Sequence, residues 1–143
     1  MPRHDNRGLA VLPRRRVRVL IALAGTIALG LASRRWPLPG FLAEYTGDAL
    51  YTVALFFGLL LLAPAARGRP VAGAAFLGSA LIEFGQRLQW PWLVELRATR
   101  FGGLVLGQGF QWADLGAYAV GACLAVAVDA AMRARARRVF ASS

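Results

Sequence analysis

The chain alternates between long uncharged stretches and short segments that hold most of its charges. Four uncharged or nearly uncharged stretches are strongly apolar: Val19 to Ser33, Ala49 to Ala66, Pro70 to Ile82, and Leu115 to Met132, the last interrupted by Asp129. A helix needs about 20 apolar residues to cross a hydrocarbon core of about 30 Å. The pattern therefore predicts an all-α membrane protein, with four transmembrane helices in a small bundle.

The first stretch is short for a span and has a second interpretation. Its 15 residues extend over only ~22 Å at about 1.5 Å each, so Arg18 and Arg34 would have to reach the two interfaces with their long side chains. Gly30-Leu31-Ala32 resembles the cleavage site of a secretory signal peptide. We favour a retained helix, because three further apolar stretches follow it.

A fifth uncharged segment, Phe101 to Ala113, contains four glycines in only 13 residues. It is too short to cross a bilayer, and glycine disfavours helix formation. Irregular backbone at membrane depth must be buried in protein or line a wet cavity. We therefore expect a short re-entrant or interfacial segment before the last helix.

The distribution of arginines predicts the orientation. With an even number of spans, both termini and the loop around Arg67 share one side, and that side holds 12 of the 17 cationic residues, all of which are Arg. The positive-inside rule then makes both termini cytoplasmic in a bacterial inner membrane. We expect a basic N-terminal tail (1–16), a transmembrane domain (17–132) and a basic C-terminal tail (133–143).

Composition agrees with this class of protein. The 143-residue chain is 57% hydrophobic and carries a formal net charge of +10, whereas soluble domains are about 45–50% apolar. These values exclude an ordinary soluble enzyme and a disordered basic tail, and a single Cys excludes a disulfide-stapled secreted domain. The arginine-rich N-terminus is better explained as an orientation signal beside anionic lipids than as a nucleic-acid-binding segment.

Most of the acidic residues fall at the predicted outer end. Ionisable groups at membrane depth are costly unless paired or hydrated, which makes them a functional-site hypothesis by default. Glu83, Gln86 and Arg87 share one helix face through their i,i+3 and i,i+4 spacing. The candidate ligand-binding residues are Asp48, Glu83, Gln86, Arg87, Arg97, Arg100 and Asp114.

These residues also have purely structural interpretations. Glu83 and Arg87 could form only a local pair at a helix end. Asp48 and Asp114 could each be acids in the first turn of a helix, favoured by its dipole and able to cap N–H groups. Because a lone buried carboxylate is costly, we expect Glu83 to pair with an arginine, for which Arg87, Arg97 and Arg100 are the candidates.

Motifs of other chemistries are absent from the sequence. It contains no HExxH, CxxC or GxSxG motif and no phosphate-binding loop, so it predicts no metal, no cofactor and no catalytic residue. An enzyme that uses Glu83 and Asp114 as an acid–base pair is the least favoured alternative. Asp129 and Arg133, four residues apart near the predicted cytoplasmic end, are expected to be structural.

Several strings along the chain resemble a known family. They resemble the pattern of a small bacterial membrane family catalogued as domain of unknown function 2809, over about residues 17 to 125. Tyr51 stands where that pattern has Trp. The strings are Gly47-Asp48-Ala49-Leu50, Ile82-Glu83-Phe84-Gly85-Gln86 and Phe110-Gln111-Trp112-Ala113-Asp114-Leu115, followed by Tyr118 and Gly121.

A more distant similarity points to the cell envelope. Glu83-x-x-Gln86, followed by Arg97, Asp114 and Gly121, is similar to the pattern of the VanZ-like membrane proteins. The resemblance implies an envelope role by analogy alone, because a shared fold does not specify a function.

Two functions are compatible with these residues. In the first, Arg97 and Arg100 hold the phosphate or carboxylate of an anionic envelope ligand, such as a lipid-linked headgroup, through their planar donor forks. Glu83, Asp48 and Asp114 would then orient these arginines and balance their charge. In the second, the protein is a structural or assembly subunit of a membrane complex. A retained lipid would favour the first function, and a stoichiometric membrane-protein partner the second.

Overall fold

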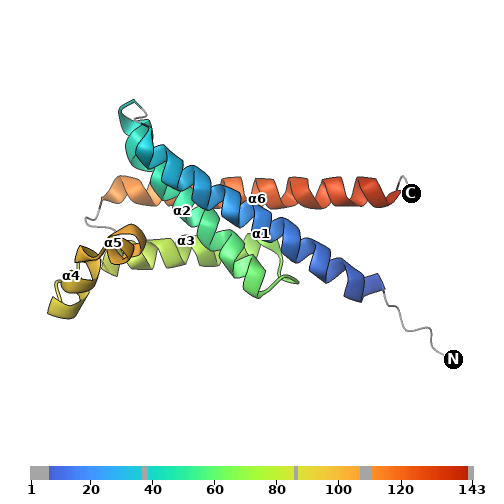
Figure 1. Ribbon diagram of the computed structural model, residues 1–143, viewed down its shortest axis with the longest axis horizontal. Coiled ribbons are helices and arrows are strands. Elements are labelled where there is room, and N and C mark those ends of the chain that lie inside the picture. The colour runs from blue at the N-terminus through green and yellow to red at the C-terminus, as the bar shows by residue number, and fades with distance from the viewer. Residues whose placement is uncertain (1–6, 37–38, 86, 107–110, 142–143) are drawn as a thin grey trace.

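The computed structural model describes residues 7–36, 39–85, 87–106 and 111–141, and their regular secondary structure is helical throughout (Figure 1). No strand occurs among these residues, which confirms the all-α prediction. The helices are α1 (Arg7–Arg35), α2 (Phe41–Leu62), α3 (Gly68–Gly85), α4 (Pro91–Ala98), α5 (Arg100–Leu106) and α6 (Trp112–Ala141).

Helix α2 is the centre of the bundle. It packs against α1, α3 and α6, and α3 also packs against α6. The four long helices run back and forth between two ends of the molecule, so that α1 begins and α6 ends at the same end (Figure 1). The short helices α4 and α5 pack together at the opposite end. We call these the terminal end and the α4–α5 end.

Three helices in the described part of the chain are long and apolar enough to cross a membrane. The candidate spans are Arg14–Arg35 in α1, Tyr45–Leu62 in α2 and Trp112–Val139 in α6. They correspond to three of the four predicted spans and indicate a multi-pass membrane protein. The remaining predicted span, Pro70 to Ile82, lies within α3, whose 18 residues include Arg69 and Glu83.

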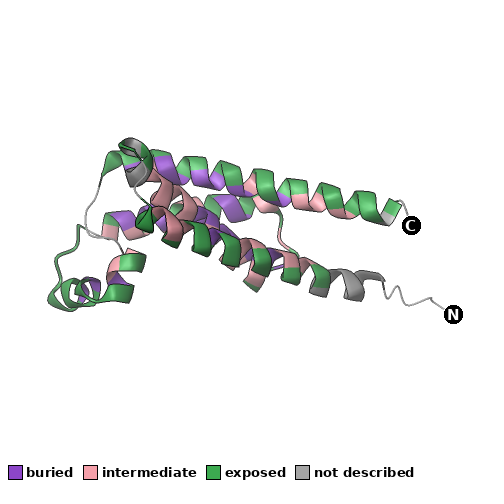
Figure 2. Cartoon of the chain, turned by 45° about the horizontal axis from the view of Figure 1, so that its top comes forward, coloured by how far each residue is buried: buried purple, intermediate pink, exposed green. Residues whose placement is uncertain are grey.

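The core lies between α2 and its neighbours. Phe56, Phe57 and Leu60 of α2 are at most 1% exposed, and the rings of the two phenylalanines pack edge to face at a centroid distance of 5.1 Å. The surrounding helices contribute mostly small residues to this core, such as Ala75 and Ala125. The outward faces of α1 and α6 remain exposed (Figure 2) although they are apolar, as expected for helices surrounded by lipid.

Glycine allows α2 and α6 to approach each other closely at one position. A Cβ added to Gly121 would lie 2.3 Å from the carbonyl oxygen of Ala49 and 3.1 Å from its Cα. Small residues that let backbones meet are typical of membrane helix interfaces. By contrast, a Cβ added to Gly116, earlier in the same helix, would meet nothing within 4 Å.

The expectation that glycine disfavours a helix in Phe101 to Ala113 is wrong for the first part of this segment, which lies in the regular helix α5. Residues 107–110 lie outside the described residues, and the re-entrant or interfacial placement stays a prediction. The Oγ1 of Thr99 accepts a hydrogen bond from the N–H of Gly102 at 3.0 Å, which caps the start of α5. A Cβ on Gly102 would lie 1.7 Å from the carbonyl oxygen of Leu96. Glycine is therefore needed here for close contact between α4 and α5, not to interrupt a helix.

Candidate functional site

A buried polar cluster lies at the α4–α5 end, where α2, α3 and α6 meet. Glu83 of α3 is only 1% exposed and accepts hydrogen bonds from α6 and from the residue before it. The Tyr118 hydroxyl of α6 donates to its Oε2 at 2.6 Å, and the Gln111 backbone N–H donates to its Oε1 at 3.3 Å. A carboxylate at this depth needs such donors, because burying a charge without partners is costly. Glu83 therefore joins α3 to α6.

Two further carboxyl groups adjoin Glu83. Asp114, also buried, lies beside Glu83 and close enough to Asp48 to feel its charge. The structure thus brings together three of the predicted site residues, and we call Asp48, Glu83, Asp114 and Tyr118 the carboxyl cluster.

The helix-start interpretation of the two aspartates holds for only one of them. Asp114 lies in the first turn of α6, and its backbone N–H donates to the Gln111 carbonyl oxygen at 3.2 Å. Asp48, by contrast, lies about two turns inside α2, which begins at Phe41. The uncharged stretch that begins at Ala49 had suggested a later start. Asp48 therefore cannot cap α2 and instead faces the other carboxyl groups.

A second polar layer lies one turn deeper. The hydroxyls of Thr52 in α2 and Ser79 in α3 are 2.9 Å apart, and both side chains are at most 1% exposed. Each residue lies four positions from a carboxyl residue, Asp48 and Glu83 respectively, on the side toward Phe56. The polar residues thus continue inward along the α2–α3 contact and end at the phenylalanines of the core.

Arg97 is buried and binds backbone carbonyl groups. Its Nη1 donates to the carbonyl oxygen of Leu88 at 3.1 Å and its Nη2 to that of Gly85 at 2.5 Å. These carbonyls lie at and just beyond the end of α3, where several backbone acceptors have no partner within the helix. Arg97 therefore fixes α4 to the end of α3.

The remaining predicted site residues are at the same end of the molecule. Arg87 follows α3, and Arg100 is the first residue of α5; both side chains are exposed. Gln86 lies outside the described residues. The pairing of Glu83 with an arginine stays a prediction. Tyr118 was missed as a site residue, although its i,i+4 spacing from Asp114 would have placed both on one helix face.

A separate ion network lies at the terminal end. Asp129 of α6 accepts a hydrogen bond from Arg133 Nε at 2.8 Å and pairs with Arg15 of α1 at 3.8 Å. Both arginines also donate to the carbonyl oxygen of Ala66, each at 3.2 Å, and Arg15 donates to that of Pro64. The network ties α1 and α6 to the α2–α3 turn, which agrees with the structural role expected for Asp129 and Arg133.

The comparison with protein families identifies the part of the chain that contains the carboxyl cluster. Residues 37–122 match the model of a family described as "Protein of unknown function (DUF2809)". The chain belongs to this family. The matched segment includes Asp48, Glu83, Asp114 and Tyr118, whereas Arg15 and Asp129 lie outside it. No solved structure matches the chain.

The arrangement has defined chemical properties. Within the described residues, no group of three or more His, Cys, Asp or Glu side chains is placed to hold a metal ion. The carboxyl cluster is instead cross-linked by hydrogen bonds, and the arginines at the same end are either bound to carbonyls or exposed. The geometry thus separates a rigid acidic interior from a cationic surface.

Proposed function

We propose that the protein is a four-span bundle of the bacterial cytoplasmic membrane that binds an anionic headgroup, such as that of a lipid-linked envelope precursor, at its α4–α5 end. Helix α3 would be the fourth span. It packs along both α2 and α6, and its outward residues Leu77 and Leu81 are 60% and 70% exposed. Apolar side chains in such positions are suited to contact with lipid.

The asymmetry of the arginines supports a cytoplasmic location for the terminal end. Labelling with a membrane-impermeant thiol reagent in intact cells tests this orientation, in a background in which Cys123 is replaced. We expect a cysteine introduced at Glu95 to react and one introduced at Arg67 to remain protected. The reverse pattern would mean that the α4–α5 end faces the cytoplasm.

The observation that carries the proposal is the arrangement of cations around Arg97. Because Arg97 binds the carbonyls of Gly85 and Leu88, it fixes the short segment that contains the exposed Arg87. Arg100 follows three residues after Arg97 and is also exposed. Arginine forks suit phosphate and carboxylate groups, so this junction offers two exposed cations on a fixed backbone.

Aromatic residues beside this junction support binding at headgroup level. Trp90 and Trp92 are more than half exposed, and Phe101 is 82% exposed. Tryptophan is enriched where membrane meets water, because its ring is apolar and its N–H is polar. The proposed site is thus an interfacial surface in which Arg87 and Arg100 lie among aromatic side chains.

The carboxyl cluster has a supporting role in this proposal. It joins α3 to α6 at this end of the bundle through hydrogen bonds that involve Glu83, Tyr118 and the backbone of Gln111, and Asp48 of α2 lies close to it. Its negative charge would also balance nearby arginines when no ligand is bound. The cluster would therefore keep the cationic surface in place without contacting the anion.

Native mass spectrometry of the protein in mild detergent with added undecaprenyl phosphate tests the proposal. We expect the wild type to retain this lipid, and the double variant Arg87→Gln/Arg100→Gln to lose it. Arg34→Gln/Arg35→Gln is a matched control, because these two arginines are also exposed at a helix end away from the terminal end. If both double variants lose the bound lipid equally, binding depends only on nonspecific charge. That result would contradict a site at Arg87 and Arg100.

The alternative is a structural or assembly subunit, and one observation favours it. The side-chain hydrogen bonds of Glu83 and Arg97 connect one helix to another or to a turn, and Asp129 of α6 pairs with Arg15 of α1. The same experiment separates the two functions. Retention of a stoichiometric membrane protein, with no lipid, would support the assembly role and overturn ligand binding.

A further inference from the structure

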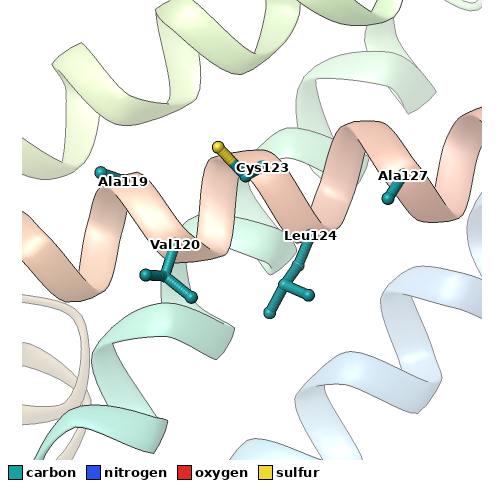
Figure 3. A pocket seen from close by; sticks show the side chains of 5 residues that line it. All are labelled: Ala119, Val120, Cys123, Leu124 and Ala127. Carbon is teal, nitrogen blue, oxygen red and sulfur yellow. The ribbon is translucent and has the colours of Figure 1, made fainter.

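A shallow apolar groove lies on the outward face of α6, away from the carboxyl cluster. Its volume is about 460 Å³, and it is lined by Ala119, Val120, Cys123, Leu124 and Ala127 (Figure 3). All five side chains are exposed. Val120 and Leu124 project from the same side of the helix (Figure 3), and the small residues beside them leave the hollow.

The same face of α6 continues toward the terminal end and becomes cationic. Ala130, Ala131 and Ala134 extend the strip of small exposed residues by helical spacing. Arg135 and Arg138 follow on this face, and both are exposed. From Cys123 to Arg135 the helix rises by about 18 Å at 1.5 Å per residue, slightly more than half of a hydrocarbon core of about 30 Å.

We propose that this face of α6 binds one anionic phospholipid, with an acyl chain in the groove and the phosphate at Arg135 and Arg138. The length of the strip matches the thickness of one leaflet. The strip is apolar at the groove, as an acyl chain requires, and cationic at its other end, as a phosphate requires. The negatively charged phosphate is complementary to Arg135 and Arg138, because basic residues next to a membrane span attract anionic lipids. The site is at the opposite end from the proposed headgroup site and does not depend on it.

Charge argues against the other obvious occupant, a second copy of the chain. Small residues four apart are typical of paired membrane helices, and Ala119, Cys123 and Ala127 have this spacing. Two copies inserted in the same orientation would, however, bring their Arg135 and Arg138 side chains together. Like charges in contact repel, whereas a lipid phosphate neutralises them.

Lipid retention in native mass spectrometry tests the proposal, with phosphatidylglycerol and zwitterionic phosphatidylethanolamine of matched chains. We expect the wild type to prefer phosphatidylglycerol, with one lipid bound per chain. Arg135→Gln/Arg138→Gln should weaken this binding about 25-fold, since each basic residue near an anionic surface contributes about fivefold. Arg67→Gln/Arg69→Gln, which removes two exposed arginines near the same end, should have a much smaller effect.

A second pair of variants tests the groove itself. Ala127→Leu fills it and should displace the lipid, while Ala74→Leu, at an exposed alanine of α3, should not. Unchanged elution and melting temperature show that each variant is folded. Equal retention of the two lipids, unchanged binding in Ala127→Leu, or a lipid-free dimer would each overturn the proposal. Loss of undecaprenyl phosphate binding alone would leave it intact.

Discussion

The close contact between α2 and α6 gives a quantitative prediction. In Gly121→Ala, the new Cβ would lie 2.3 Å from the carbonyl oxygen of Ala49. An ordinary contact needs at least 3.4 Å, so α2 and α6 must separate locally by about 1 Å. The atoms in contact belong to backbone inside a helix and cannot rotate away. The whole α2–α6 interface therefore has to adjust.

The expected magnitude follows from this geometry. Overpacking of a well-packed interior typically costs about 1–3 kcal/mol. Alanine has a greater helix propensity than glycine, by about 1 kcal/mol in water. This difference should largely cancel between the folded and the unfolded protein, because membrane helices stay formed when they separate. We therefore expect Gly121→Ala to lower the free energy of unfolding by about 1–3 kcal/mol.

Unfolding in mixed micelles, followed by near-ultraviolet circular dichroism as a denaturing detergent is added, measures this change. Gly116→Ala is the matched control on the same helix, since its Cβ would meet nothing within 4 Å, and we expect a change below about 0.5 kcal/mol. Gly78→Ala should fall between them, because its Cβ would lie 3.1 Å from the movable tip of Leu55. Equal effects at all three glycines would refute the close α2–α6 contact.

Two further substitutions test the α4–α5 end. Tyr118→Phe should lower the free energy of unfolding by about 1.5–3 kcal/mol, because the tyrosine hydroxyl donates to the Glu83 carboxyl group. The control Tyr51→Phe, at a partly buried tyrosine of α2, should lower it less. Equal losses in the two variants would contradict the role of this hydrogen bond. Arg97→Lys should speed amide hydrogen exchange in residues 88–98, since an ammonium lacks the fork that bridges two carbonyls. The control Arg100→Lys should not change this exchange. Unchanged exchange in Arg97→Lys would contradict the role of Arg97 in fixing α4 to α3.

The long helices could be predicted from the sequence because charge marks their ends. Apolar runs bounded by charged residues located α1, α2, α3 and α6. Helices α1, α3 and α6 extend beyond both ends of their runs, whereas α2 begins and ends earlier than its run. The ends differed because a helix can continue through charged residues at a membrane interface, where their side chains reach water. The short helices α4 and α5 have no apolar run of sufficient length and were not predicted.

The sequence could predict which acidic residues lie together in the candidate site, but not which side chains contact each other. The grouping of Asp48, Glu83 and Asp114 followed from their positions at one end of three helices. The contact of Tyr118 with Glu83 spans 35 positions, and no local pattern indicates which tyrosine reaches which acid. The role of Arg97 was also hidden, because its partners are backbone carbonyls, which every residue has.

The same distance along the chain has a consequence for biosynthesis. Glu83 is made 35 residues before Tyr118, which corresponds to roughly 2–7 s of translation at 5–20 residues per second. During that interval, α3 carries an acidic residue whose tyrosine partner has not yet been synthesised, and a polar group without partners is costly in lipid. On the proposed four-span topology, helix α3 should therefore remain near the insertion machinery until α6 emerges, so that the last two long helices enter the bilayer as a pair.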